Sequence, residues 1–225
     1  MEKRALAAAI EQSVLKPTAT EADVLGACRE AAAHGFHGVC VNPIHTAWAR
    51  AAADSMGHAA KIKIITVIAF PLGGATPAAK VYEAMKAAQG GSDELDIVMA
   101  VPLAMEGNWR GVEKDIADVI AATPGLVHKV IIETAYLKGL AEMEQAALAS
   151  LRAGASFVKT STGYSPKGAT VQDVAALKKI LGARAGIKAA GGIRTAEAAT
   201  ELLRAGATRI GTSSGVQIME GIPAR

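Results

Sequence analysis

Short apolar segments rich in β-branched residues alternate with alanine-rich segments along the whole chain, and this alternation restricts the possible fold more than any other property of the sequence. We expect eight of the apolar segments to be strands: Ile10–Leu15, Gly38–Val41, Lys63–Phe70, Glu94–Met99, His128–Glu133, Ser156–Thr160, Gly186–Ala190 and Thr208–Gly211. Between them apolar residues recur three and four positions apart, as at Val171, Val174 and Leu177, a spacing that places them on one helix face. The sequence therefore predicts alternating strands and helices.

The predicted helix boundaries carry matching signals. Thr20 and Thr170 each precede an aspartate by three positions, which indicates a helix start with a capping box. Glycines stand where helices should end before the next strand, at Gly35, Gly90, Gly154 and Gly206. In addition, LRAGASFVKT at 151–160 returns as LRAGATRIGT at 203–212. Each copy of this repeat contains a helix end, a glycine and a strand, which indicates a repeated βα unit.

Eight strands that alternate with helices predict an α/β fold, the (β/α)8 or TIM barrel. Such barrels typically have about 250 residues, and roughly 200 is near their lower limit, so 225 residues suffice. No linker rich in proline or glycine divides the sequence, and we expect residues 1–225 to form a single catalytic domain. The alternative is a doubly wound open sheet. That fold usually has fewer strands and a glycine-rich phosphate loop after the first, which this sequence lacks.

The charge and the cysteine content of the sequence indicate which binding partners and which cellular compartment to expect. The formal net charge is only +3, and the lysines and arginines are scattered, so we expect no nucleic-acid partner. No apolar stretch approaches the ~20 residues of a membrane span, and the first apolar run is shorter than the ~7–15 residues of a secretory signal. Cys28 and Cys40 form no C-x-x-C pair, in keeping with a reducing compartment. We expect a soluble cytoplasmic protein without a membrane partner.

Two lysines stand near the ends of predicted strands six and seven: Lys159 in FVKTSTG and Lys188 in GIKAAGG. In a (β/α)8 barrel the carboxyl ends of the strands face the active site, and neighbouring strands lie about 4.8 Å apart. A lysine attacks a carbonyl group only when neutral, and both burial and a nearby ammonium favour the neutral form. The pair therefore predicts a nucleophilic amine. The alternative is two surface lysines whose stems lie along the barrel rim.

Asp96 is a carboxylate inside the otherwise apolar segment ELDIV. Schiff-base chemistry needs an acid and base, for which Asp96 is the candidate; the alternative is a structural partner of a lysine or a backbone group. The five histidines are scattered and form no zinc-binding motif. No Walker A and no G-x-G-x-x-G sequence is present. We therefore expect neither a metal nor another cofactor.

Glycines and serines follow predicted strands seven and eight. Glycines let backbone N–H groups reach an anion, serines add donors, and a short helix after Ser214 would offer its positive end. (β/α)8 barrels commonly hold phosphate at these two strands, so the segments predict a phosphate site; ordinary turn chemistry is the alternative. The candidate residues are Gly191, Gly192, Gly211, Ser213 and Ser214, with Gly163 and Lys167 from the loop after strand six.

Several segments together carry a family resemblance: FVKTSTG with GATVQDV after it, IKAAGGIRT, RIGTSSGV, SDELDIVM, HKVIIET, TVIAFPLG and VCVNP. They resemble the deoxyribose-phosphate aldolases, a family of class I aldolases, and the similarity runs from about Ile10 to Ile218. The resemblance implies a (β/α)8 barrel and a lyase. It also implies reversible cleavage of 2-deoxy-D-ribose 5-phosphate to D-glyceraldehyde 3-phosphate and acetaldehyde through a lysine Schiff base, without a metal. Deoxyribonucleotide catabolism would be its setting.

The same resemblance assigns roles to individual residues. Lys159 matches the Schiff-base lysine, Lys188 the second lysine that lowers the pKa of the nucleophile, and Asp96 the relay carboxylate. The residues that match the phosphate-binding segments are Gly163, Gly191, Gly192, Ser213 and Ser214. The implied partners are a phosphosugar and aldehydes, and family members are often dimers, so a homodimer is expected.

The chain departs from the family where that family usually reads I-D-H-T-L-L-K-P. Here the segment is IEQSVLKP, so Glu11 keeps the carboxylate, Ser13 keeps the hydroxyl, and Gln12 replaces an imidazole. Two other functions remain as alternatives. One is a related barrel aldolase with a different aldehyde acceptor, and the other is a catalytically silent phosphosugar-binding protein.

Overall fold

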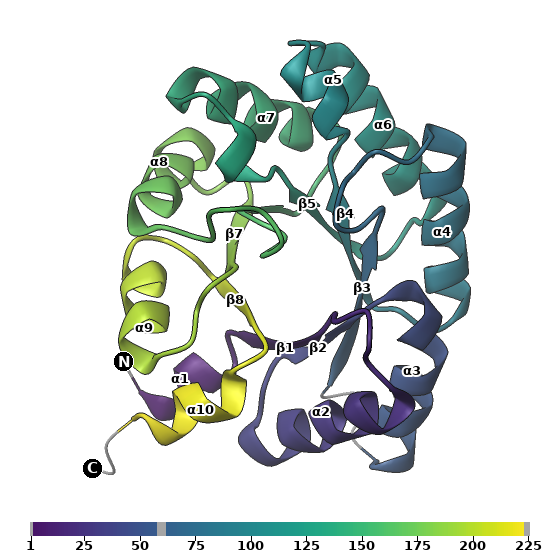
Figure 1. Cartoon of the computed structure of the whole chain (residues 1–225), viewed down its shortest axis with the longest axis vertical. Coiled ribbons are helices and arrows are strands. Elements are labelled where there is room, and N and C mark those ends of the chain that lie inside the picture. Colours follow the sequence, from purple (N-terminus) through teal and green to yellow (C-terminus); the bar gives the residue numbers. More distant parts are fainter. Residues whose placement is uncertain (1, 58–61, 223–225) are drawn as a thin grey trace.

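The chain folds into a closed barrel of eight parallel strands in the order β1 to β8, with β8 hydrogen-bonded back to β1. The computed structural model describes residues 2–57 and 62–222. Helices surround the strands on the outside (Figure 1); α1 precedes β1, and at least one α-helix follows every strand. The predicted (β/α)8 barrel is confirmed, and the open sheet is excluded because β1 pairs with both β2 and β8.

The strands are β1 Ile10–Val14, β2 Gly38–Val41, β3 Lys63–Ile68, β4 Glu94–Val98, β5 Val127–Ile131, β6 Phe157–Lys159, β7 Gly186–Ala190 and β8 Arg209–Thr212. The α-helices are α1 Lys3–Ala7, α2 Glu21–His34, α3 Thr46–Ser55, α4 Pro77–Gln89, α5 Val101–Met105, α6 Trp109–Ala122, α7 Leu140–Arg152, α8 Val171–Leu181, α9 Ala196–Arg204 and α10 Gly215–Glu220. Two 3-10 turns lie at η1 Pro43–His45 and η2 Thr134–Tyr136.

The observed boundaries agree with the sequence signals. Each strand begins and ends within two residues of its predicted limits, and β2 and β7 match at both ends. Thr20 caps α2 in a capping box with Asp23, and the hydroxyl of Thr170 accepts a hydrogen bond from the Asp173 N–H at the start of α8. Gly35 adopts a left-handed conformation at the end of α2, which a residue without Cβ adopts readily.

The apolar core lies between the barrel wall and the helices. Residues alternate along each strand, so Val39 and Val41 of β2 face this outer layer, whereas Cys40 groups with Ile65 and Val67 of β3 in a separate cluster. Cys40 Sγ also lies 3.9 Å from the Asp96 carboxylate, which places this cluster on the inner face of the barrel. Among the described residues, no helix is both long enough and apolar enough to cross a membrane.

The inside of the barrel is unusually polar. (β/α)8 barrels usually fill this space with layers of branched aliphatic side chains. Here the interior also contains six charged side chains that are almost fully buried, namely Glu11, Glu94, Asp96, Lys129, Lys159 and Lys188. Buried charges are costly unless they are paired, so their contacts define the interior of this molecule.

Candidate active site

A cavity of about 650 Å³ opens at the carboxyl ends of the strands. Residues from the ends of β1, β6, β7 and β8 and from the loops that follow them form its wall, as expected for the active-site end of a (β/α)8 barrel. Of the residues predicted from sequence, the lining includes Lys159, Gly163, Gly191, Gly192, Gly211, Ser213 and Ser214. Lys159 is therefore the predicted catalytic side chain that reaches the cavity surface.

The three predicted catalytic residues meet in the barrel interior. Lys159 at the end of β6 lies directly opposite Lys188 of β7 in the strand register. The Nζ atoms of Lys159 and Lys188 lie 2.8 Å and 2.6 Å from the same Asp96 oxygen, Oδ2. Lys159 is only 2% exposed, and the other two residues are fully buried. The surface-lysine alternative is therefore wrong for both lysines.

The charges in this cluster strongly bias its protonation. Burial alone would raise the pKa of Asp96, but the ammonium groups of Lys129, Lys159 and Lys188 hold it well below its usual value. Burial opposes the charge on Lys188, yet the carboxylates of Asp96 and Glu11 outweigh it and raise the pKa of this ammonium. Asp96 is thus an ionised carboxylate at neutral pH, and Lys188 is a persistent cation beside Lys159.

Lys129 and Glu11 complete the cluster, and neither was singled out as catalytic from the sequence. Lys129 Nζ donates to Asp96 Oδ1 at 3.0 Å and lies 3.5 Å from Glu11 Oε1. Lys188 also donates a hydrogen bond to Glu11. Strand alternation could have identified Lys129, since it lies opposite Asp96 in the register of β4 and β5 and so shares its face. That register, however, is a property of the closed barrel.

The glycine segments bring backbone close to the cavity. Gly191 has φ of 92°, in the region that favours glycine, and a Cβ there would lie 3.0 Å from Gly168 Cα. At Gly211 a Cβ would lie 3.0 Å from Lys188 Cε. Gly211 therefore also leaves room for the stem of the second lysine. After Ser214 the predicted short helix is present as α10.

Lys167 is the predicted binding residue that the structure does not bring to the cavity. Its Nζ lies 3.0 Å from Asp173 Oδ2 at the start of α8, so the ammonium is paired away from the lining. Two other basic residues, Lys16 and Arg194, line the cavity instead. Sequence reasoning missed both because their positions depend on how the loops after β1 and β7 curve over the barrel end.

Tyr164 ties together two of the loops around the cavity. It lies in the loop after β6, and its hydroxyl donates to the Leu15 carbonyl at 2.8 Å, at the end of β1. Glu133, after β5, accepts hydrogen bonds from the Thr162 N–H at 3.1 Å and from the Ser165 hydroxyl at 2.8 Å. These contacts fix the loop that follows the nucleophile candidate.

Gln12, which the sequence resemblance sets in place of an expected imidazole, is held by two hydrogen bonds. Its Nε2 donates to Glu30 Oε2 at 2.7 Å, and its Oε1 accepts from the Gly215 N–H at 3.0 Å. A neutral amide can make both bonds at once because it carries a donor and an acceptor. Gln12 thus connects β1 to α2 and to the first residue of α10, beside the serines of the cavity.

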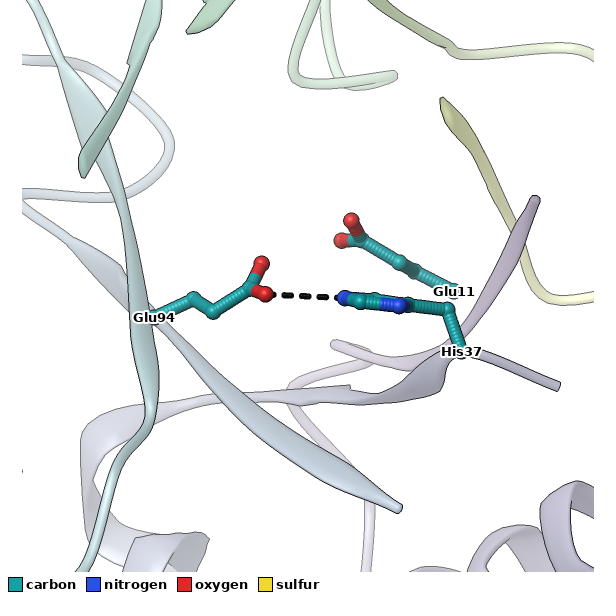
Figure 2. A group of neighbouring side chains, drawn as sticks. All are labelled: Glu11, His37 and Glu94. Atoms are coloured by element: carbon teal, nitrogen blue, oxygen red, sulfur yellow. Dashed lines mark hydrogen bonds and ion pairs between the residues drawn. The ribbon is translucent and has the colours of Figure 1, made fainter. Parts of the chain in front are cut away.

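The same cluster of buried charges continues toward the amino-terminal ends of the strands. Glu94 is the first residue of β4, His37 directly precedes β2, and both lie beside Glu11 (Figure 2). Glu11, His37 and Glu94 have carboxylate and imidazole atoms within 4.8 Å of one another, which are the donor types of a metal site. Lys129 Nζ, however, lies 2.5 Å from Glu94 Oε2 and 3.5 Å from Glu11 Oε1. A divalent cation there would stand against this ammonium, so the donor set does not fit a metal ion.

Taken together, the fold and the site define a (β/α)8-barrel protein with a buried amine and carboxylate cluster beneath its cavity. A comparison with protein families agrees with this class: residues 5–221 match the DeoC/LacD family of aldolases. The chain belongs to this aldolase family and is an enzyme of the lyase class.

Named relatives cover nearly the whole chain. A deoxyribose-phosphate aldolase from Thermococcus kodakarensis is 46% identical over 99% of both chains, and one from Deinococcus radiodurans is 45% identical over 96% of both. Among solved structures, a tetrameric deoxyribose phosphate aldolase from Aeropyrum pernix has a TM-score of 0.90 at 34% identity, covering 97% of this chain and 91% of that one. An aldolase named QR15 has a TM-score of 0.90 at 38% identity, covering 96% and 94%.

Proposed function

We propose that this enzyme reversibly cleaves 2-deoxy-D-ribose 5-phosphate to D-glyceraldehyde 3-phosphate and acetaldehyde, with Lys159 as the Schiff-base lysine. One observation carries the proposal: Lys159 is a buried amine that lines the cavity, contacts the Asp96 carboxylate and faces a second lysine across the strand register. The names of relatives at about 45% identity support the choice of substrate.

Imine formation begins with neutral Lys159. Its Nζ attacks C1 of the open-chain sugar phosphate, and the resulting carbinolamine loses its oxygen as water to give a protonated imine. Lys188 favours this step because a persistent ammonium on the neighbouring strand opposes a second charge on Lys159. Asp96 lies against both amines and limits the electrostatic cost of packing them together.

Bond cleavage then uses the protonated imine as an electron sink. The C3 hydroxyl loses its proton to the relay of Asp96 and Lys188 through a water, and C3 becomes the aldehyde carbon of glyceraldehyde 3-phosphate. The C2–C3 electrons form the C1=C2 bond of an enamine on Lys159. The relay returns a proton to C2, and water hydrolyses the new imine to release acetaldehyde and the free amine.

The phosphate would lie in the part of the cavity formed by Gly163, Gly191, Gly192, Gly211, Ser213 and Ser214. Backbone N–H groups and two hydroxyls supply donors there. Lys16 and Arg194 add positive charge to the same cavity. We therefore expect these two residues, and not Lys167, to provide the cations for phosphate.

Borohydride trapping tests the nucleophile. Incubation with acetaldehyde, reduction and peptide mass mapping should place an ethyl group on Lys159. In Lys159→Met the adduct should be lost, and kcat for 2-deoxy-D-ribose 5-phosphate should fall by at least about a thousandfold. Lys16→Met is the matched control, since this lysine lines the same cavity without contacting Asp96. It should keep the Lys159 adduct and mainly raise KM for the phosphorylated substrate.

Two outcomes would overturn the proposal. A protein that binds 2-deoxy-D-ribose 5-phosphate but forms no adduct would be a catalytically silent binding protein. An adduct on Lys159 without cleavage of this sugar phosphate would indicate an aldolase for a different acceptor, which a panel of aldehydes would identify.

A further inference from the structure

Glu133 is an almost fully buried carboxylate that the proposed reaction does not use. It lies two residues after the end of β5, and none of the described residues 127–137 forms part of the cavity lining. Its backbone has φ of 45° and ψ of 70°, in the left-handed region that is uncommon for a residue with a Cβ. Such a conformation persists where the surrounding structure holds it, and it often marks a functional position.

The carboxylate of Glu133 holds both ends of a short turn after β6. Its Oε2 accepts hydrogen bonds from the Thr162 N–H at 3.1 Å and from the Thr162 hydroxyl, and its Oε1 accepts from the Ser165 hydroxyl at 2.8 Å. The Thr162 hydroxyl in turn accepts a hydrogen bond from the Tyr164 N–H at 3.1 Å. One carboxylate from the loop after β5 therefore sets the path of residues 162–165.

Gly163 is the residue of this turn whose N–H is left free. The N–H groups of Thr162 and Tyr164 on either side are bonded within the turn network, whereas the Gly163 N–H bonds to no part of the chain that the structure describes. Gly163 lines the cavity, and its φ is 88°. A free backbone N–H at a cavity wall is a donor suited to a phosphate oxygen. The contacts of Glu133 thus leave this donor available to a ligand.

The same turn also sets the position of a glycine after β7. A Cβ on Gly191 would lie 3.0 Å from Gly168 Cα and 3.2 Å from Gly163 Cα, and a Cβ on Gly168 would lie 2.2 Å from the Gly191 carbonyl oxygen. The Ala169 N–H also donates to the Gly191 carbonyl at 3.2 Å. The two backbones are in direct contact, so a shift of the loop after β6 would move Gly191 as well.

Thr134, the residue after Glu133, holds the two sides of the same loop. Its N–H donates to the Thr160 carbonyl at 2.9 Å, and its hydroxyl donates to Asp173 Oδ2 at 3.1 Å. Lys167 Nζ lies 3.0 Å from the same Asp173 oxygen. Lys167 therefore helps to hold the loop in place, although its ammonium does not line the cavity.

Resting on the proposed function, we propose that Glu133 is a positioning residue for the substrate phosphate. It fixes the donor loop after β6 and, through that loop, Gly191, and so sets the preference for a phosphorylated over an unphosphorylated sugar. Glu133 touches no substrate in this scheme, because it lies outside the cavity lining. Lys159 precedes the turn and is held by Asp96, so imine formation should not depend on Glu133.

Three variants test the proposal with 2-deoxy-D-ribose 5-phosphate and with unphosphorylated 2-deoxy-D-ribose. Glu133→Leu nearly keeps the volume of the side chain but accepts no hydrogen bond. In Glu133→Gln the amide oxygen can still accept both bonds from Thr162, and the amide NH2 can donate to the Ser165 hydroxyl. Glu142→Leu is the matched control, since Glu142 accepts from the Lys138 N–H at 2.8 Å but holds no cavity residue.

Glu133→Leu should raise KM for the phosphorylated sugar by at least about tenfold, the loss expected when one hydrogen bond to a charged group is removed. Its kcat/KM for the unphosphorylated sugar, and its rate of acetaldehyde trapping on Lys159, should stay within about threefold of the wild type. Glu133→Gln should restore most of the KM, and Glu142→Leu should leave it unchanged. A purely structural role would impair both sugars equally; that result, or an unchanged KM in Glu133→Leu, would overturn the proposal.

Ser165→Ala covers the case in which Glu133→Leu does not fold, because Ser165 is half-buried and lies outside the cavity lining. This variant removes the bond to Glu133 Oε1 and should raise KM for the phosphorylated sugar by at least about twofold, without a change for the unphosphorylated one. Equal KM values would then contradict the proposal. A wild type that cleaves neither sugar and forms no adduct on Lys159 would instead refute the proposed function, which separates the two failures.

Discussion

At the scale of single residues, one buried carboxylate, that of Asp96, pairs with three lysine ammonium groups. Asp96 presents Oδ2 to both Lys159 and Lys188 and Oδ1 to Lys129. A carboxylate has enough lone pairs for these donors, whereas an amide would carry no charge to balance them. Gly211 has no Cβ, and this leaves space for the stem of Lys188.

Replacing Gly211 with alanine should therefore impair catalysis through Lys188. A Cβ at this position would stand 3.0 Å from Lys188 Cε, closer than ordinary van der Waals contact, and would push the ammonium away from Asp96. We expect kcat to fall by at least about tenfold, since small misplacements of catalytic groups are costly. Steady-state kinetics on 2-deoxy-D-ribose 5-phosphate would show this. Gly74→Ala is a matched control because its Cβ would meet nothing within 4 Å and its backbone is not in the left-handed region; equal losses in both variants would contradict the role of Gly211.

At the scale of secondary-structure elements, a buried ion pair fixes two helices over the strand that carries Asp96. Lys80 of α4 lies 2.6 Å from Asp115 of α6, and both side chains are almost fully buried. Lys80 also donates to the carbonyl of Val98, the last residue of β4, at 3.0 Å. Burial lowers the pKa of Lys80 and raises that of Asp115, and the hydrogen bond and opposite charge of the partner work against both shifts.

Breaking this pair from one side should cost much stability. Lys80→Met leaves the Asp115 carboxylate buried and unpaired, which typically costs about 3–5 kcal/mol. Urea denaturation would measure the loss. The double variant Lys80→Met/Asp115→Leu should recover most of it, because no unpaired charge remains. As a control in α6, the helix that carries Asp115, Lys114→Met removes the exposed pair with Asp118 and should cost less than about 1 kcal/mol of stability. A double variant no more stable than Lys80→Met alone would refute this account.

At the scale of the whole molecule, barrel closure forces charged side chains from five strands into one interior. Glu11, Glu94, Lys129, Lys159 and Lys188 join Asp96 there, and their mutual pairing offsets the cost of burial. Since the carboxylates must be ionised for this balance, the free energy of unfolding should depend on pH.

Glu94 gives this pH dependence a definite window. Its pKa in the folded protein is about 2, below the ordinary 4.5, so its contribution is complete above about pH 4.5 and is lost as the pH falls toward 2. The shift corresponds to roughly 3 kcal/mol. Denaturation measured between pH 7 and pH 2.5 should show the decline. Glu94→Gln should be less stable than the wild type at pH 7, with a gap that narrows toward pH 2.5; a gap of constant size would rule out this assignment.

The sequence alone determined the alternation of strands and helices and the positions of the helix caps, because these follow from local periodicity and from hydrogen bonds between near neighbours. It also placed Lys159, Lys188 and Asp96 on strands whose carboxyl ends share one face. Each of these predictions needed only the spacing of residues within one segment and the general geometry of a barrel.

Only the tertiary structure decided which charges meet. Lys129 and Glu11 are 118 positions apart, yet they share the interior with Asp96, because the strand register around the closed barrel sets which side chains point inward. Loop paths decided that Lys167 pairs with Asp173 while Lys16 and Arg194 reach the cavity. Periodicity within a segment carries no information about such register and loop geometry, since both arise from packing between segments distant in sequence.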